Sequence, residues 1–265
     1  MKKKRIIPVL LLRNGQLVQS KLFKEYKNLG NPFKAVERFS QWDADELIYL
    51  DISSGSQNTS GRTDLKVSSN FSLEELIVEV AKSATMPITF GGGIRSLEVA
   101  ELRIRLGADK VSVNTLLITN FRVVEQIASK FGTQAVVGSV DYSFLHGRYV
   151  VYHEGQADPE LDLFEHISRL ADYGVGEVLL NAVDRDGMKT GLDIDLYELA
   201  TRKTSLPVIG MGGAGKWSDF AEALGSSGLD AVAAANVFQH FDQSVYLARK
   251  SAFEAGIPVR KPTLM

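Results

Sequence analysis

Short apolar runs rich in β-branched residues alternate along the chain with amphipathic stretches of helix length. The apolar runs predict eight strands: Arg5–Leu12, Glu46–Ile52, Pro87–Phe90, Lys110–Val113, Ala135–Asp141, Glu177–Ala182, Val208–Met211 and Ala231–Ala235. The amphipathic stretches predict eight helices: Pro32–Trp42, Leu73–Ala84, Leu97–Leu106, Phe121–Phe131, Leu161–Tyr173, Leu192–Lys203, Trp217–Leu224 and Ser244–Ala255. Continuous apolar strands are typical of parallel sheets buried on both faces. The pattern predicts an α/β fold, a (β/α)8 TIM barrel, with a doubly wound sheet as the rival.

The second half of the chain repeats the first. PITFGGGIRS at Pro87 is echoed by PVIGMGGAGK at Pro207, and GADKVSVNT at Gly107 is echoed by GLDAVAAAN at Gly228, so the offsets are 120 and 121 residues. Such self-similarity indicates a duplicated unit. We therefore expect one barrel domain over residues 1–265, made of half-barrels at about 1–131 and 132–265.

Composition excludes several classes of protein. The 265 residues carry a net charge of −2, which argues against a general nucleic-acid binder. The chain has no cysteine, so thiol chemistry and thiolate metal sites are excluded, and its four histidines show no metal-ligand spacing. The basic, apolar N-terminus imitates a signal peptide but is better explained as a first buried strand. We expect a cytoplasmic protein without a membrane span, metal or cofactor.

Both glycine-rich segments follow an apolar strand and precede a helix, an arrangement that can bind phosphate through backbone amides. A plain tight turn is the simpler explanation of either one alone, and the repeat strengthens the phosphate hypothesis. Lys216 nearly completes a P-loop, but Trp217 stands where that motif needs serine or threonine. Each turn would act with polar residues at neighbouring strand ends, which gives the candidate binding residues Gly92, Gly93, Asn114, Thr115, Asn181, Asp186, Gly187, Gly212, Gly213 and Asn236.

One carboxylate ends an otherwise apolar strand. Asp141 stands at the predicted carboxyl end of the fifth strand, where barrels place catalytic groups, so it is a candidate general acid or base. A structural carboxylate that accepts bonds from loop amides explains it equally well. Its counterpart in the first half is Leu11, so an acid–base pair across the mouth would be half missing.

Two connections are longer than the rest. The segment Ser53–Ser72 is polar and rich in serine and glycine, and it follows the second predicted strand. It is either a functional loop at the mouth or a disordered one. After the fifth strand, Leu145 and Tyr149–Val151 flank His146-Gly147-Arg148, which predicts a small hairpin.

Several segments together resemble the cyclase subunit of imidazole glycerol phosphate synthase: KRIIPVLLLRNG, DELIYLDI, FGGGI, GADKVSVNT, DRDGMKTG and GGAGK. The resemblance covers almost the whole chain and implies a barrel that docks a glutaminase subunit on its N-terminal face and receives ammonia through its axis. It implies two phosphate sites, one at Gly93, Asn114 and Thr115 and one at Asp186, Gly187, Gly213 and Asn236. It also implies an ammonia gate at Arg5, Glu46, Lys110 and Glu177, with Asp109 facing the glutaminase.

The chain departs from that family at the mouth. Leu11 replaces the family's first catalytic aspartate and Gln19 replaces a lysine that contacts substrate, whereas Asp141 is kept. The pattern resembles the paralogues associated with acetamidino modification of bacterial surface sugars, which work with a glutaminase and a separate sugar amidotransferase. The main hypothesis is therefore an ammonia-channelling subunit for that modification. A genuine histidine-pathway cyclase, with Asp51 as substitute acid, and a non-catalytic activator of the glutaminase stay open.

Overall fold

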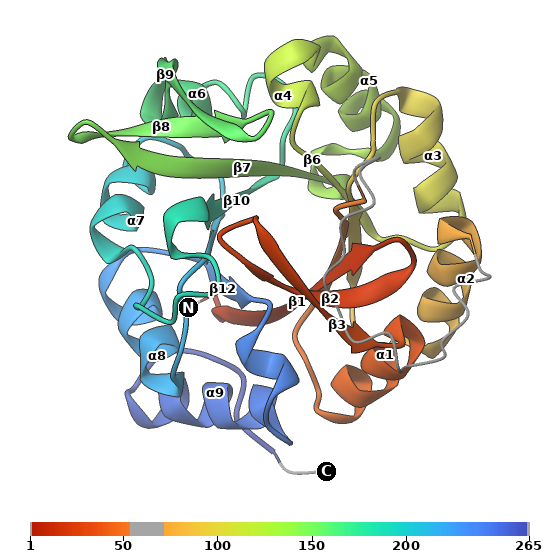
Figure 1. The fold of residues 1–265 in the computed structure, drawn as a ribbon, viewed down its shortest axis with the longest axis vertical. Helices are drawn as coiled ribbons and strands as arrows, with labels where there is room; N and C mark the ends of the chain where they lie inside the picture. Colours follow the sequence, from red (N-terminus) through yellow and green to blue (C-terminus); the bar gives the residue numbers. More distant parts are fainter. Residues whose placement is uncertain (1, 54–71, 264–265) are drawn as a thin grey trace.

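The computed structural model describes residues 2–53 and 72–263. Eight parallel strands form a closed ring in the order β1, β4, β5, β6, β7, β10, β11, β12, because β1 pairs with β12 and β7 pairs with β10. Helices surround this ring (Figure 1). The predicted (β/α)8 barrel is confirmed. The ring strands are β1 Arg5–Arg13, β4 Leu47–Asp51, β5 Ile88–Gly91, β6 Lys110–Val113, β7 Val136–Leu145, β10 Glu177–Ala182, β11 Val208–Met211 and β12 Ala231–Ala234.

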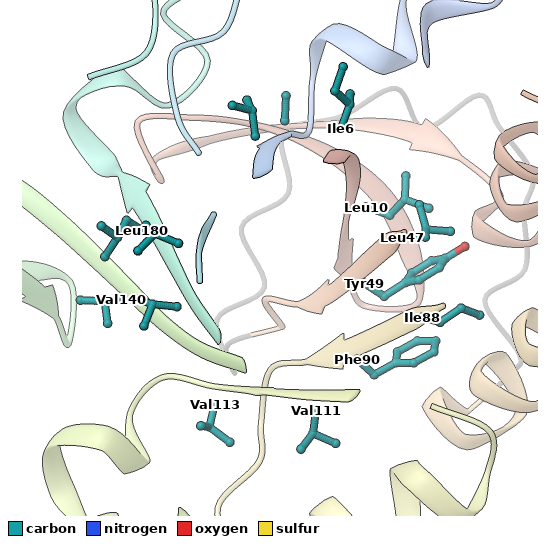
Figure 2. Close-up of a cluster of buried hydrophobic side chains, with 14 of the residues drawn as sticks. Ile6, Leu10, Leu47, Tyr49, Ile88, Phe90, Val111, Val113, Val140 and Leu180 are labelled. Carbon is teal, nitrogen blue, oxygen red and sulfur yellow. The ribbon is translucent and has the colours of Figure 1, made fainter. Parts of the chain in front are cut away.

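Side chains alternate along each ring strand between the barrel interior and the helix layer. In β1, Ile6 and Leu10 belong to the outer core, whereas Ile7 and Val9 belong to a separate inner cluster. Figure 2 shows part of the outer core, including Tyr49 and Phe90, whose rings stack 5.0 Å apart. The same alternation turns Leu11 inward at the carboxyl end of β1. The strands thus fix which side chains can meet at either end of the barrel.

The helices of the described chain pack their apolar faces on the outer core. They are α1 Pro32–Gln41, α2 Leu73–Ser83, α3 Leu97–Arg105, α4 Leu116–Thr119, α5 Phe121–Phe131, α6 Leu163–Ser168, α7 Ile194–Ala200, α8 Trp217–Ser226 and α9 Ser244–Glu254, with 3₁₀ turns η1 Thr133–Ala135, η2 Val183–Arg185 and η3 Val237–Gln239. Two predicted helices were too long. After Ser168 and Ala200 the chain continues in i to i+3 hydrogen bonds, such as Lys203 N to Ala200 O at 2.9 Å, so the α-helices end early.

Two hairpins extend from the carboxyl end of the barrel. The hairpin predicted after the fifth strand is confirmed: β7 continues to Leu145 and pairs with β8 Arg148–His153, which pairs with β9 Gln156–Asp162. The second hairpin, β2 Gln16–Lys21 with β3 Glu25–Gly30, was not predicted. It lies across the centre of the ring in Figure 1. Most of the predicted loop Ser53–Ser72, residues 54–71, lies outside the described residues.

Candidate functional site at the two ends of the barrel

Four charged side chains meet inside the amino end of the barrel. Arg5 begins β1, Lys110 begins β6, Glu177 begins β10, and Glu46 immediately precedes β4. Arg5 Nη1 lies 2.5 Å from Glu46 Oε1, and its Nη2 donates to Glu177. Lys110 Nζ lies 3.1 Å from both Glu46 Oε2 and Glu177 Oε2. The four residues predicted as an ammonia gate therefore form a closed cycle of alternating charge.

This charged ring is nearly buried, with side chains that are 9–19 % exposed. Burial opposes charging, but the hydrogen bonds and charges of Glu177 and Glu46 raise the pKa of Arg5. Burial likewise opposes the charge of Glu177, while Arg5 and Lys110 lower its pKa below the usual value. Arg5 and Glu177 thus stabilise each other's charged form. Asp109 lies at the same end, exposed, where its Oδ2 accepts a hydrogen bond from Ile88 N at 2.8 Å.

An apolar layer separates the charged ring from the carboxyl end. Inward side chains from β1, β4, β7, β10, β11 and β12 pack there, among them Ile7, Val9, Ile48, Val137, Leu179 and Ile209. An ion is costly to transfer through such a lining, whereas a small neutral molecule pays a much smaller desolvation penalty. The layer ends at Leu11 and Met211, which border the mouth.

The mouth contains one carboxylate held by two amides. Asn114 Nδ2 donates to Asp141 Oδ2 at 2.8 Å, and Asn181 Nδ2 donates to Asp141 Oδ1 at 2.9 Å. Burial raises the pKa of Asp141 to about 6, further helped by the charge of Asp186, although the two amide bonds lower it. The group can therefore exchange a proton near neutral pH. Asn181 Oδ1 is itself buried without a hydrogen-bond partner.

Asp141 and Leu11 line the same cavity of about 180 Å³, as the repeat predicted. Its wall combines apolar side chains from Leu50, Ile52 and Met211 with the polar groups of Ser112 and Asn181. Asp51 lines it too, while its Oδ1 accepts a bond from Ser53 N at 3.0 Å. Three carboxylates, those of Asp51, Asp141 and Asp186, therefore reach this cavity, but none occupies the position of Leu11.

The first glycine turn borders a larger open space. A cavity of about 540 Å³ is lined by Gly92, Gly93, Asn114 and Thr115, all predicted binding residues, and by Arg95. Gly93 has φ +65°, and a Cβ atom built on it would come no closer than 3.6 Å to another group, Arg103 Nη2. This cavity shares Asn114 and Asp141 with the smaller one.

The second glycine turn is closed by comparison. Its cavity measures about 20 Å³, and it is lined by the predicted residues Asp186, Gly187, Gly212, Gly213 and Asn236. A Cβ atom on Gly213 would lie 2.2 Å from the carbonyl oxygen of Gly191. The amides of Gly215 and Lys216 donate to the buried Asp219 Oδ2 at 2.8 and 3.1 Å. A side chain of the protein thus takes the place an anion would have at that helix start.

Two predicted binding residues hold the β2–β3 hairpin over the mouth. Asp186 Oδ2 accepts from Ser20 Oγ at 2.6 Å and from Phe23 N at 3.3 Å. Asn236 Nδ2 donates to Ser20 O at 2.7 Å. Sequence reasoning missed this hairpin. It also missed the turn before it, where Asn14-Gly15, a strong hairpin signal with positive φ at both residues, joins β1 to β2.

Other mouth candidates lie elsewhere or form no site. Asp184, in η2, accepts bonds from Ser143 Oγ at 2.7 Å and Phe144 N at 2.8 Å and so anchors the β7–β8 hairpin. His153 pairs with Asp158 at 3.0 Å. Among residues 2–53 and 72–263, no group of three potential metal ligands occurs. No helix in those ranges combines the length and hydropathy needed to cross a bilayer.

Comparison with known proteins agrees with this architecture. A family model described as "Histidine biosynthesis protein" matches residues 5–244. A Pseudomonas aeruginosa protein named "Putative imidazole glycerol phosphate synthase subunit hisF2" is 40 % identical over 240 residues, which cover 90 % of this chain and 91 % of that protein. A Vibrio vulnificus protein of the same name is 35 % identical over 262 residues, which cover 98 % of this chain and 92 % of that protein. The "Imidazole glycerol phosphate synthase subunit HisF" of Corynebacterium diphtheriae is 37 % identical over 264 residues, which cover 97 % of this chain and 98 % of that protein.

Proposed function

Because the chain belongs to the histidine biosynthesis protein family, with HisF and hisF2 subunits among its relatives, we propose that it is an ammonia-channelling, cyclase-like subunit of a glutamine-dependent synthase. A glutaminase of the class I amidotransferase type would dock at the amino end, where Asp109 is exposed. Ammonia would enter through the charged ring, cross the apolar layer and leave at the cavity beside Asp141. The complex would work in the cytoplasm.

The closed charged ring carries this proposal. Four buried charges are expensive to hold inside a barrel, and well-packed apolar residues are often as stable or better. A function that needs a barrier to bulk water and ions at the axis explains their presence. Neutral ammonia could cross the apolar layer behind the ring once a Lys110 contact opens, whereas ammonium would pay the cost of desolvation.

We propose further that the released ammonia serves amidination of a bacterial surface sugar rather than imidazole formation. Leu11 cannot transfer a proton, and general acid–base catalysis typically contributes about 10²–10⁴-fold to a rate. The mouth keeps Asp141 and the glycine turns, which would hold a phosphorylated small molecule. A separate sugar amidotransferase would use the ammonia.

The test is a reconstitution with the partner glutaminase and ¹⁵N-amide glutamine. Turnover of the histidine-pathway precursor should be at least about 10²-fold below that of a HisF enzyme assayed in parallel. Glutamine hydrolysis should nevertheless be stimulated by the barrel, and ¹⁵N should reach an acetamidino sugar when the sugar amidotransferase is added. Cyclase turnover at the HisF rate would refute the sugar assignment while leaving the ammonia path intact.

Leu11→Asp sharpens that test, because it restores a carboxylate opposite Asp141 in the same cavity. Residual cyclase turnover should rise by about 10²-fold. Leu11→Asn, which has the same size without a proton to transfer, is the matched control and should leave the rate low. If both variants behave like the parent chain, Leu11 does not limit cyclization.

A second candidate is a genuine cyclase that uses Asp51 as its other acid. The observation in its favour is that Asp51 and Asp141 line one cavity. In that case the parent chain would rescue a histidine auxotroph, and Asp51→Asn would abolish the rescue. A non-catalytic activator would stimulate the glutaminase in both Asp51→Asn and Asp141→Asn variants equally well.

A further inference from the structure

The smaller cavity at the mouth, which we call the exit cavity, is lined by carboxylates but by no cationic side chain. Asp51, Asp141 and Asp186 all border it, whereas no lysine, arginine or histidine of the described chain does so. Asp51 interacts with the charge of Arg103, which lies outside the lining. Burial raises the pKa of Asp141 and of Asp186, and the hydrogen bonds that oppose this come from neutral amides and a hydroxyl. At neutral pH the exit cavity therefore has an excess of negative charge.

Two buried oxygens in the same lining lack a hydrogen-bond partner. Asn181 is 5 % exposed, and its Nδ2 donates to Asp141, so its Oδ1 is turned away from that carboxylate and is left without a partner among the described residues. Ser112 is 3 % exposed, and its hydroxyl has no partner there either. Buried polar groups are normally hydrogen-bonded, and leaving one unsatisfied costs free energy. Because an amide oxygen can only accept, the partner that Asn181 Oδ1 lacks is a donor.

The charge and the free acceptors together select a small cation that donates hydrogen bonds. A water molecule would satisfy Asn181 Oδ1 but would leave the carboxylate charges uncompensated. A metal ion needs converging ligands, and no group of three potential metal ligands occurs among residues 2–53 and 72–263. Ammonium carries a positive charge, and all of its N–H groups are donors. The rings of Phe23 and Tyr26, which also line the cavity, can attract a cation to their faces.

We propose that the exit cavity is a binding site for ammonium, with Asp141 as its main counter-ion and the free oxygens of Asn181 and Ser112 as acceptors. The inference rests on the proposed function for the arrival of ammonia at this end of the barrel. An amine is a much stronger base than a carboxylate. Ammonia that meets the protonated Asp141 therefore takes its proton: an N–H bond forms, the O–H bond breaks, and ammonium lies beside a carboxylate.

Protonation at this place makes the passage of nitrogen one-way. The apolar layer below the cavity can be crossed by neutral ammonia, whereas ammonium would have to leave its carboxylate and lose its hydration to return. Leu11 belongs to that layer and also borders the exit cavity, so it extends the apolar lining up to the cavity wall. The residue that weakens the case for cyclization thus suits a cavity that retains ammonium.

The experiment titrates the full chain, without any glutaminase, with ¹⁵N-ammonium chloride while sodium chloride keeps the ionic strength constant. Proton-detected ¹⁵N spectra report the bound ion, because the protons of an enclosed ammonium exchange slowly with water. We expect saturable binding of one ammonium per chain. Nuclear Overhauser contacts from its protons to the methyl groups of Leu11 and Met211, which border the cavity, would locate it.

Three variants test the assigned contacts. Asp141→Asn keeps the shape of the side chain but removes its charge, so ammonium should bind at least about tenfold more weakly. Ser112→Ala removes a hydroxyl that has no partner among the described residues, so only a ligand contact is lost, and binding should weaken by about threefold. Asp172→Asn removes an exposed carboxylate from the turn after α6 and is the matched control, which should bind like the parent chain.

Three results would overturn the inference: no saturable binding, equal affinity in Asp141→Asn and the parent chain, or sodium competing as well as ammonium. Thermal melts without ammonium show whether each variant is folded. If Asp141→Asn does not fold, Ser112→Ala and the Overhauser contacts still decide. Absence of binding alongside normal ¹⁵N delivery in the glutaminase reconstitution would refute the ammonium site alone, whereas binding without delivery would refute the ammonia path and leave a cation site.

Discussion

The two halves that the sequence repeat predicts contain similar strands and glycine turns, but their charged residues are distributed unequally. At the amino end each half supplies one glutamate, Glu46 and Glu177, while both cations, Arg5 and Lys110, come from the first half. At the carboxyl end the second half supplies Asp141 and the first supplies Leu11. Corresponding positions of the sequence repeat thus carry different side chains at both ends of the barrel.

The glycine turns show what this difference means for binding. The first is open, with a buried arginine behind it, whereas the second is closed against Gly191 and carries Asp219 inside its helix start. Similar local sequence patterns therefore lead to different surroundings, because the neighbouring residues determine whether the amides face a cavity or the protein itself.

The largest expected effect separates the two turns directly. Gly213→Ala would place Cβ 2.2 Å from the Gly191 carbonyl at φ +97°, so backbone must move, and we expect a loss of about 4 kcal/mol in unfolding free energy. Gly93→Ala meets nothing closer than 3.6 Å at φ +65° and should cost about 1 kcal/mol. Urea unfolding of both variants measures the contrast. Equal losses would contradict the view that Gly213 is packed against backbone whereas Gly93 is not.

The next prediction concerns the charged ring, in which both cations come from the first half of the chain. Arg5→Leu leaves Glu46 and Glu177 with Lys110 as the only cation of the ring, so we expect a loss of about 3 kcal/mol in stability. Arg5→Lys should recover part of it. Lys82→Ala, which breaks an exposed pair with Glu79, is the matched control and should cost less than about 1 kcal/mol. A loss in Arg5→Leu no larger than in Lys82→Ala would show that the ring does not stabilise the barrel.

The sequence predicts the barrel well because its signals are local and repeated. Apolar runs predicted the ring strands. The family resemblance grouped Arg5 with Glu177, and the structure pairs them although 172 residues separate them. The β2–β3 hairpin was missed because its strands are short and polar. The contacts that the hairpin makes could not be predicted either, because the bond that Ser20 donates to Asp186 and the bond that it accepts from Asn236 depend on where the hairpin folds back.

The sequence predicted where the candidate site lies, but it did not predict the contacts that close the second glycine turn. Strand ends placed Asp141, Asn114 and Asn181 in one mouth, and the structure brings them into hydrogen-bond contact. The closing of the second turn depends on the Gly191 carbonyl and on Asp219, contacts between segments that no local pattern encodes. From the sequence, Arg103 is predicted to be an ordinary surface arginine of a helix. The structure shows that it is buried and donates a hydrogen bond to Gly91, next to the first glycine turn.

The smallest effect concerns the carboxylate that the second half contributes. Burial raises the pKa of Asp141 from 3.8 to about 6, so the folded chain holds this proton more tightly than the unfolded chain. Its contribution to stability is full below about pH 4 and is lost as the pH rises to about 6, a change of about 3 kcal/mol in all, of which about 2 kcal/mol falls above pH 4.5. Unfolding free energies of the parent and Asp141→Asn, measured from pH 4.5 to 8, should converge in acid and diverge in favour of the variant in base. The hydrogen bond from His153 instead lowers the pKa of Asp158, so the stability that Asp158 contributes is lost only below about pH 4, and this carboxylate adds no slope between pH 4.5 and 8. Parallel curves for the parent and Asp141→Asn in that range would show that Asp141 titrates as it does in water and that its burial opposite Leu11 does not shift its pKa.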